Sequence, residues 1–124
     1  MNVEALPLMK QVEMVFRELK DELLNLSSGI VFIQIRNNVI GKFGVKHDPF
    51  ESREGEPFNR QGGLSEAQLM AFRKMAVESL RHKKNWTHGE IRFEFALKRN
   101  VLHTSVQFES NYNMANLLKR SVSQ

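Results

Sequence analysis

The sequence predicts an α+β fold, a two-layer sandwich in which a four-stranded antiparallel sheet carries helices on one face. Two stretches rich in alternating apolar and polar residues begin at Gly29 and Gly89, and each follows an amphipathic helical pattern. A lone hairpin is marginal in water, so the second αββ unit is what completes a core. The predicted order is αββ-αββ-α in a single domain, residues 1–124, with repeats at 1–46 and 64–109, a loop at 47–63 and a C-terminal helix at 111–120.

The first unit begins with a helix whose apolar residues recur at steps of three and four, which places them on one stripe facing the core. The stripe consists of Leu8, Val12, Val15, Leu19, Leu23 and Leu26. A Ser-Ser-Gly sequence then ends the helix. The following residues, rich in Ile and Val, predict a strand at 30–36, and Asn37 and Asn38 predict a turn into a second strand at 39–46.

The segment at 47–63 predicts a loop, because it holds two Pro, three Gly and six charged residues without periodicity. Connections of this length in a compact domain are usually functional or disordered. Phe50 and Phe58 each follow a Pro, and two interpretations stay open for them. They are exposed anchors for a protein partner, or they pack inward and hold the loop against the domain.

The second unit starts at Ser65, where a Gln three residues later completes a capping-box pattern. A helix with its own apolar stripe follows. The next hairpin alternates cleanly, with Ile91, Phe93, Phe95 and Leu97 facing inward on its first strand and Leu102, Thr104, Val106 and Phe108 on its second. A turn at Arg99 and Asn100 joins the two strands. After this hairpin, Ser110 is the expected cap of a short closing helix that carries Met114, Leu117 and Leu118.

Helices on one face leave the other face of the sheet open to solvent. The residues expected to line this open face are Gln34, Arg36, Lys42, Arg92, Glu94, His103, Ser105 and Gln107. The formal charge of +4 is unevenly spread: residues 1–62 hold eight Lys or Arg against nine Asp or Glu, and residues 63–124 hold ten against five. Such asymmetry can mark a surface for an anionic partner, but a charge of this size is within ordinary charging for solubility.

A basic segment in the second half is the candidate anion-binding site. Its residues are Arg81, Lys83, Lys84, Trp86 and Arg92, which interleave positive charge with an aromatic ring. Basic and aromatic side chains beside an open sheet are typical of surfaces that bind single-stranded nucleic acid. The alternative interpretation is that the run only compensates the negative end of the preceding helix dipole.

No residue pattern indicates a cofactor, a metal or a catalytic centre. The chain has no Cys, which excludes disulfides, zinc-thiolate sites and a cysteine nucleophile, and favours a reducing compartment. The four His do not form metal-binding spacings, and no Gly-rich phosphate loop occurs. The N-terminal stretch lacks the features of a signal peptide or a membrane span, so we expect a cytoplasmic protein. Because no catalytic pattern occurs, we expect that it is not an enzyme.

Two family resemblances follow from this organisation. The Trp that precedes a strand in "NWTHGEIRFEFALKRNVLHTSVQFES", after a helix-hairpin-loop-helix order, resembles YezG-like immunity proteins. That resemblance implies a small cytoplasmic antitoxin that neutralises a toxin. The order of elements also resembles that of type III secretion chaperones, and implies a dimeric binder of a protein partner.

The sequence therefore predicts a small, non-catalytic cytoplasmic module that binds a protein partner, with the open sheet face or the loop as the contact surface. The alternative is a nucleic-acid-binding protein that uses the basic region at residues 81–99. The identity of the partner is not encoded in any motif, and a dimer is compatible with the pattern.

Overall fold

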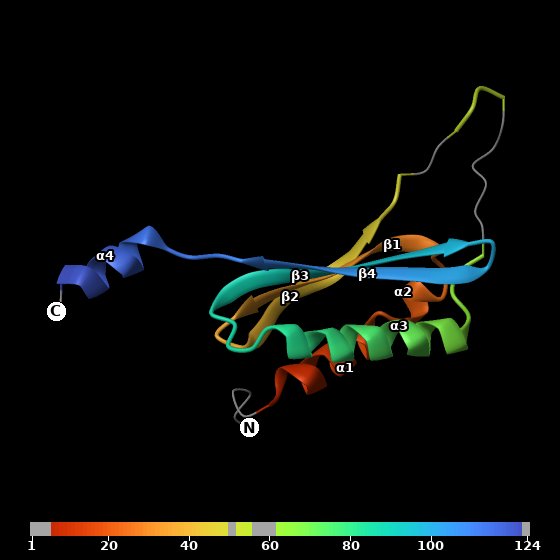
Figure 1. The fold of residues 1–124 in the computed structure, drawn as a ribbon. Coiled ribbons are helices and arrows are strands. Elements are labelled where there is room, and N and C mark those ends of the chain that lie inside the picture. Colours follow the sequence, from red (N-terminus) through yellow and green to blue (C-terminus); the bar gives the residue numbers. More distant parts are fainter. Residues whose placement is uncertain (1–5, 50–51, 56–61, 123–124) are drawn as a thin grey trace.

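The computed structural model describes residues 6–49, 52–55 and 62–122 and confirms an α+β fold built on one open antiparallel sheet. Helices α1 to α3 cover one face of the sheet (Figure 1). The elements in chain order are α1 (Leu8–Glu18), α2 (Lys20–Leu23), β1 (Ser28–Arg36), β2 (Val39–His47), α3 (Glu66–Ser79), the 3-10 turn η2 (Leu80–His82), β3 (His88–Lys98), β4 (Val101–Ser110) and α4 (Met114–Val122).

The strand order is β2-β1-β3-β4, with every neighbouring pair antiparallel. The first strands of the two hairpins pair with each other in the centre of the sheet, from Ser28 opposite Ala96 to Arg36 opposite His88. The repeated αββ unit thus brings two hairpins together through β1 and β3. As a consequence, the second strand of each hairpin, β2 or β4, forms an edge of the sheet.

Both hairpins close through two-residue turns in the left-handed region. Asn37 and Asn38 have φ of 52° and 61°, and Arg99 and Asn100 have φ of 51° and 63°. Positive φ at both central residues defines the type I′ turn, whose twist matches that of paired strands. Asn tolerates this region better than most residues, which explains its use at both turns.

The first helix is shorter than the predicted stripe and is interrupted. Helix α1 ends at Glu18, Leu19 has φ −88° and ψ 1°, and α2 continues to Leu23. The stripe still faces the sheet, because Val12, Val15, Leu19 and Leu23 are all buried. The second helix begins as predicted: the Ser65 hydroxyl accepts the Gln68 N–H at 3.1 Å, and Gln68 Oε1 accepts the Ser65 N–H at 2.9 Å.

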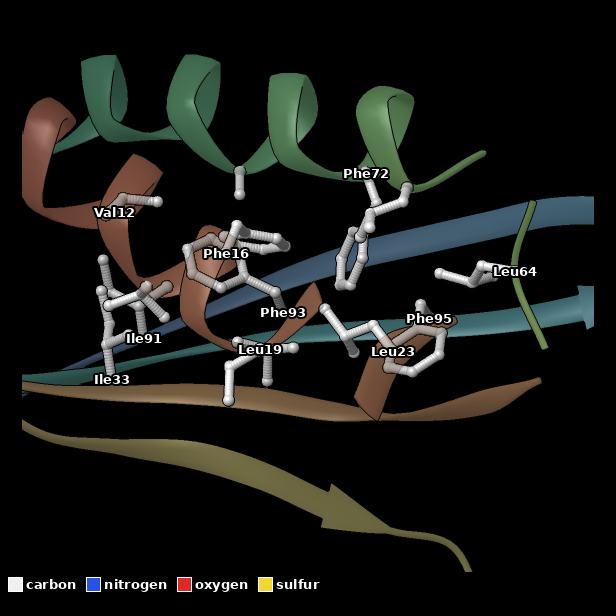
Figure 2. Close-up of a cluster of buried hydrophobic side chains, with 14 of the residues drawn as sticks. Val12, Phe16, Leu19, Leu23, Ile33, Leu64, Phe72, Ile91, Phe93 and Phe95 are labelled. Carbon is white, nitrogen blue, oxygen red and sulfur yellow. The ribbon is translucent and has the colours of Figure 1, made fainter. Parts of the chain in front are cut away.

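The core lies between the helices and the sheet and is centred on aromatic rings (Figure 2). The ring centroid of Phe16 in α1 lies 5.1 Å from that of Phe72 in α3 and 6.0 Å from that of Phe93 in β3. Phe72 in turn lies 5.0 Å from Phe95. These rings join both helices to the same strand, so the two αββ units share one core.

The C-terminal helix differs from its prediction in two respects. It starts at Met114 and not at residue 111, because β4 runs on to Ser110. Its cap is Asn113, whose Oδ1 accepts the Ala115 N–H at 2.8 Å, and not Ser110. It also does not close the domain: the chain continues the direction of β4 beyond the sheet, and α4 projects from that end (Figure 1).

Candidate functional site

The edge of the sheet formed by β2 has features that disfavour pairing with a further strand. Its pairing with β1 is broken by an irregularity between Ile33 and Ile35. Two lysines, Lys42 and Lys46, lie on the strand. Bulges and lysines on edge strands are devices by which proteins prevent other chains from adding to a sheet.

The opposite edge, formed by β4, lacks these devices. Its pairing with β3 runs without interruption from Gly89 opposite Ser110 to Lys98 opposite Val101. The ten residues of β4 include no Lys, Arg or Pro, and Glu109 is their one carboxylate. A long, regular edge strand of this kind presents its free backbone groups to any strand that can pair with it.

The residues of β4 whose backbone faces outward follow from the hairpin geometry. The Asn111 N–H donates to the His88 carbonyl at 2.9 Å, and the two-residue turn makes Lys98 and Val101 a hydrogen-bonded pair. Odd-numbered residues of β4 therefore bond to β3. The N–H and C=O groups that point away from the sheet belong to Leu102, Thr104, Val106, Phe108 and Ser110.

A groove of about 490 Å³ lies beside this edge, between β4 and the helix layer. Its helical wall comes from α3 and η2, and its strand wall from β4 between Thr104 and Phe108. The lining residues are Met75, Glu78, Ser79, Arg81, His82, Thr104, Ser105, Val106 and Phe108. Val106 and Phe108 are only half-buried and Thr104 is exposed, although they share the face of the fully buried Phe93. The inward face of β4 is thus covered by helices only in part.

Helix α4 adds exposed apolar surface at the end of the same strand. Four of its flanking and helical side chains are largely exposed: Tyr112 at 86%, Met114 at 65%, Leu118 at 58% and Leu117 at 47%. An amphipathic helix normally buries its apolar stripe against another element. The exposed stripe of α4 follows the free edge of β4 along the chain, and the two together are here called the β4–α4 surface.

The open face of the sheet is polar, as the sequence predicted, with an apolar strip on β1. Gln34, Arg36, Glu94, His103, Ser105 and Gln107 are exposed there, and Lys42 lies beside them on β2. Phe32 lies across Gly44 of the paired strand, where an added Cβ would stand 3.0 Å from its ring. The Phe32 side chain is half-buried.

Three charged side chains of the open face are paired with each other. The Arg92 guanidinium lies 2.5 Å from Glu90 and 3.7 Å from Glu109. A shallow hollow of about 350 Å³ next to this network is lined by three basic side chains, Arg36, Lys42 and His88, and by Glu90 and Glu109. Its mixed charge gives no preference for an anion or a cation.

The structure does not bring the five residues of the basic segment together. Arg81, Lys83 and Lys84 lie at the end of the helix layer, whereas Arg92 lies on the opposite face of the sheet and is ion-paired. Trp86 is 1% exposed, its ring is packed edge-on against Phe108 at 5.6 Å, and the Lys83 ammonium covers it at 5.0 Å. The ring of Trp86 is therefore not available for stacking against a base.

The two Phe of the loop, Phe50 and Phe58, lie outside the residues that the structure describes. Within residues 6–49, 52–55 and 62–122, no group of three His, Asp or Glu side chains is placed to hold a metal ion. None of the helices in those ranges is both long and apolar enough to cross a membrane.

Sequence reasoning missed the β4–α4 surface. A signal was present, because residues 101–110 lack the lysines that residues 39–47 carry. This signal has meaning only once both strands are known to be edges. Comparisons of the chain with models of protein families, with curated proteins and with solved structures found no match.

Proposed function

We propose that the protein is a non-catalytic interaction module that binds a protein partner by strand addition along β4. The observation that carries the proposal is the unguarded edge of β4 with the groove of about 490 Å³ beside it. An extended segment that adds to a sheet edge gains affinity from backbone hydrogen bonds and specificity from the pockets that receive alternate side chains.

The groove supplies the second part of this recognition mode. A strand paired with the outward groups of Thr104 and Val106 would direct every second side chain under α3, against Met75 and Phe108. Apolar side chains suit the floor of this site, and Glu78, Arg81 and His82 provide a polar rim. An immunity-type or chaperone-like role is a specific form of this binding, in which the added strand belongs to a toxin or a secreted client.

Nucleic-acid binding through the basic region has less support. Such binding needs a continuous positive surface with accessible aromatic rings. Arg92 is separated from Arg81 by the sheet, and Trp86 is buried. Binding to single strands, if it occurs, would fall steeply with salt because it would rest on phosphate contacts alone.

The experiment that tests the proposal compares Thr104→Pro with Thr104→Val. Proline has no N–H, and on an edge strand it is tolerated where that N–H faces solvent. Thr104 is such a position, and its side chain is exposed, so the substitution removes an outward donor with little loss of packing. Valine keeps the donor and has nearly the same volume.

The three proteins are used as baits in extracts of the source organism, with and without nuclease. We expect a protein partner that is retained by the wild type and by Thr104→Val in both conditions and is lost with Thr104→Pro. Circular dichroism is used as the control that the Thr104→Pro variant is folded. Capture that is insensitive to Thr104→Pro, or that disappears with nuclease, contradicts the proposal.

A further inference from the structure

We infer that one partner of the β4 edge is a second copy of this chain, paired antiparallel so that the two sheets of four strands join into one. This inference rests on the proposed function, because it uses the same edge and the same recognition mode. It names the occupant and the register: the two copies meet on a two-fold axis at Val106, with Thr104 of each copy opposite Phe108 of the other.

The positions of the free backbone groups select this register. The joined sheet keeps the helices of both copies on one face only if inward-facing residues stand opposite inward-facing residues. Centring the pairing on Val106 places every β4 residue whose backbone N–H and C=O point away from the sheet opposite another such residue of the second copy. The matched residues are Leu102, Thr104, Val106, Phe108 and Ser110. Centring it on Ser105 or Thr104 pushes Ser110 past the strand of the second copy and forms fewer hydrogen bonds.

Hydrogen-bonding complementarity between polar side chains favours the same register. Glu109 is the one carboxylate of β4, and His103 is its one imidazole. With Val106 on the axis, His103 of each copy stands opposite Glu109 of the other on the open face. Ser105 then stands opposite Gln107, so no like charges face each other across the junction.

Side-chain size is also complementary across the junction. Thr104 is small and exposed at the rim of the groove, whereas Phe108 is large and half-buried. Each Thr104 leaves room for the Phe108 of the second copy on the inward face. The junction therefore extends the apolar layer under the helices without opposing two bulky rings.

The register also gives α4 a neighbour. With Ser110 opposite Leu102 of the second copy, the chain after residue 112 passes the β3–β4 turn of that copy. The turn lies at the start of α3, since Gln68 Nε2 donates to the Asn100 carbonyl at 3.2 Å. Val101 beside the turn is 57% exposed. In this register Asn111 stands opposite Val101, and α4, which begins at Met114, follows directly beyond the turn of the second copy.

Cysteine substitution tests the register directly, because the natural chain has no Cys. Val106→Cys places two thiols opposite each other, and the Cα separation of about 5.5 Å in such a pair suits a disulfide. Thr104→Cys is the matched control. Its two thiols would be displaced by four residues, about 13 Å along the strands, which is beyond the reach of a disulfide.

We expect Val106→Cys to form about tenfold or more covalent dimer than Thr104→Cys under mild oxidation, because only the former pair lies within disulfide reach. Random collision predicts the opposite order, since Thr104 is the more exposed of the two. Sedimentation of the unmodified protein should give twice the chain mass of 14.4 kDa. Thr104→Pro should give the mass of a single chain, and Thr104→Val should give that of the dimer.

Three outcomes overturn the inference: a wild type that stays at the mass of one chain, a dimer that persists in Thr104→Pro, or equal cross-linking of the two Cys variants. The first leaves the proposed function intact if a host protein is still captured through Thr104-sensitive binding. If the wild type neither dimerises nor captures a host protein in that way, both the inference and the proposed function fail.

Discussion

Asn38 and Trp86 join the two αββ units at one end of the central strands. The Asn38 Oδ1 accepts the backbone N–H of Trp86 at 2.7 Å, and the backbone N–H of Asn38 donates to the Trp86 carbonyl at 2.8 Å. Gln11 adds a third element, because its Nε2 donates to the Asn38 carbonyl at 3.0 Å. A single turn residue thus closes the first hairpin, holds the segment that enters β3 and contacts α1.

Replacing Asn38 with Gly should lower the free energy of unfolding by about 1–3 kcal/mol, because the Trp86 N–H loses its acceptor in a partly buried site. Gly adopts the φ of 61° found here without strain, so the loss comes from the hydrogen bond and from the greater freedom of the unfolded chain. Asn38→Ala should be less stable than Asn38→Gly, since Ala also carries a Cβ in the left-handed region. Urea unfolding measures both. Equal stability of Asn38→Gly and the wild type would contradict the role assigned to Asn38.

Truncating Phe93 to Ala should lower the free energy of unfolding by about 3–5 kcal/mol, as expected for a buried aromatic side chain. Phe93 is 0% exposed and lies in ring contact with Phe16. Met70→Ala is the control, because Met70 on α3 is 61% exposed, and its loss should change stability by less than about 0.5 kcal/mol. A thermal melt of Phe93→Ala that matches the control would contradict the described core.

Both hairpins could be predicted from the sequence because two independent signals coincide. The alternation of apolar and polar residues predicted the strands, and the turn residues Asn37 and Asn100 predicted where the chain reverses in each hairpin. The inward face of β3 was predicted correctly for Ile91, Phe93 and Phe95, which are all buried. Its neighbour β4 has the predicted face but less burial, because an edge strand has a neighbour on only one side.

Strand order could not be predicted, and the β4–α4 surface depends on it. No residue pattern distinguishes a sheet in which β1 pairs with β3 from one in which β2 does. The C-terminal helix was predicted to close the domain because an apolar stripe implies burial. The structure shows no such closure. An apolar stripe predicts that a helix is buried, but it does not indicate which element buries it.

The position of Trp86 illustrates how a local pattern can mislead. Its basic neighbours predicted a surface position, but Gly89, three residues later, leaves the space that the indole ring fills. An added Cβ at Gly89 would lie 2.5 Å from that ring and 2.4 Å from the Glu109 carbonyl oxygen. The absence of a side chain at one position therefore determines the burial of another, which periodicity alone does not reveal.

This packing predicts that Gly89→Ala is strongly destabilising. Overpacking against backbone and a buried ring should lower the free energy of unfolding by about 1–3 kcal/mol or more. Gly41→Ala on β2 is the matched control, because a Cβ there meets nothing within 4 Å. Thermal melts of the two variants should differ by several degrees. A melt of Gly89→Ala as high as that of Gly41→Ala would place Trp86 elsewhere than described.

Removing α4 should separate its role in assembly from any role in folding. Because Met114, Leu117 and Leu118 are 47–65% exposed, the domain core does not depend on their burial. In the Thr104→Pro background, where the β4 junction is blocked, a chain that ends at residue 113 should melt within about 2 °C of the chain that ends at residue 124. In the wild-type background, the same truncation should weaken self-association, because it removes apolar surface that the second copy would cover.

Sedimentation and thermal melts compare four proteins, which are the truncated and the full-length chain, each with and without Thr104→Pro. Met114→Ser with Leu118→Ser in the full-length chain serves as the control for chain length, since it removes the apolar surface and keeps every residue position. It should reproduce the truncation in both backgrounds. If the truncated chain melts many degrees lower even when Thr104→Pro is present, then α4 stabilises its own domain, and its exposed stripe is not the complement of a second copy.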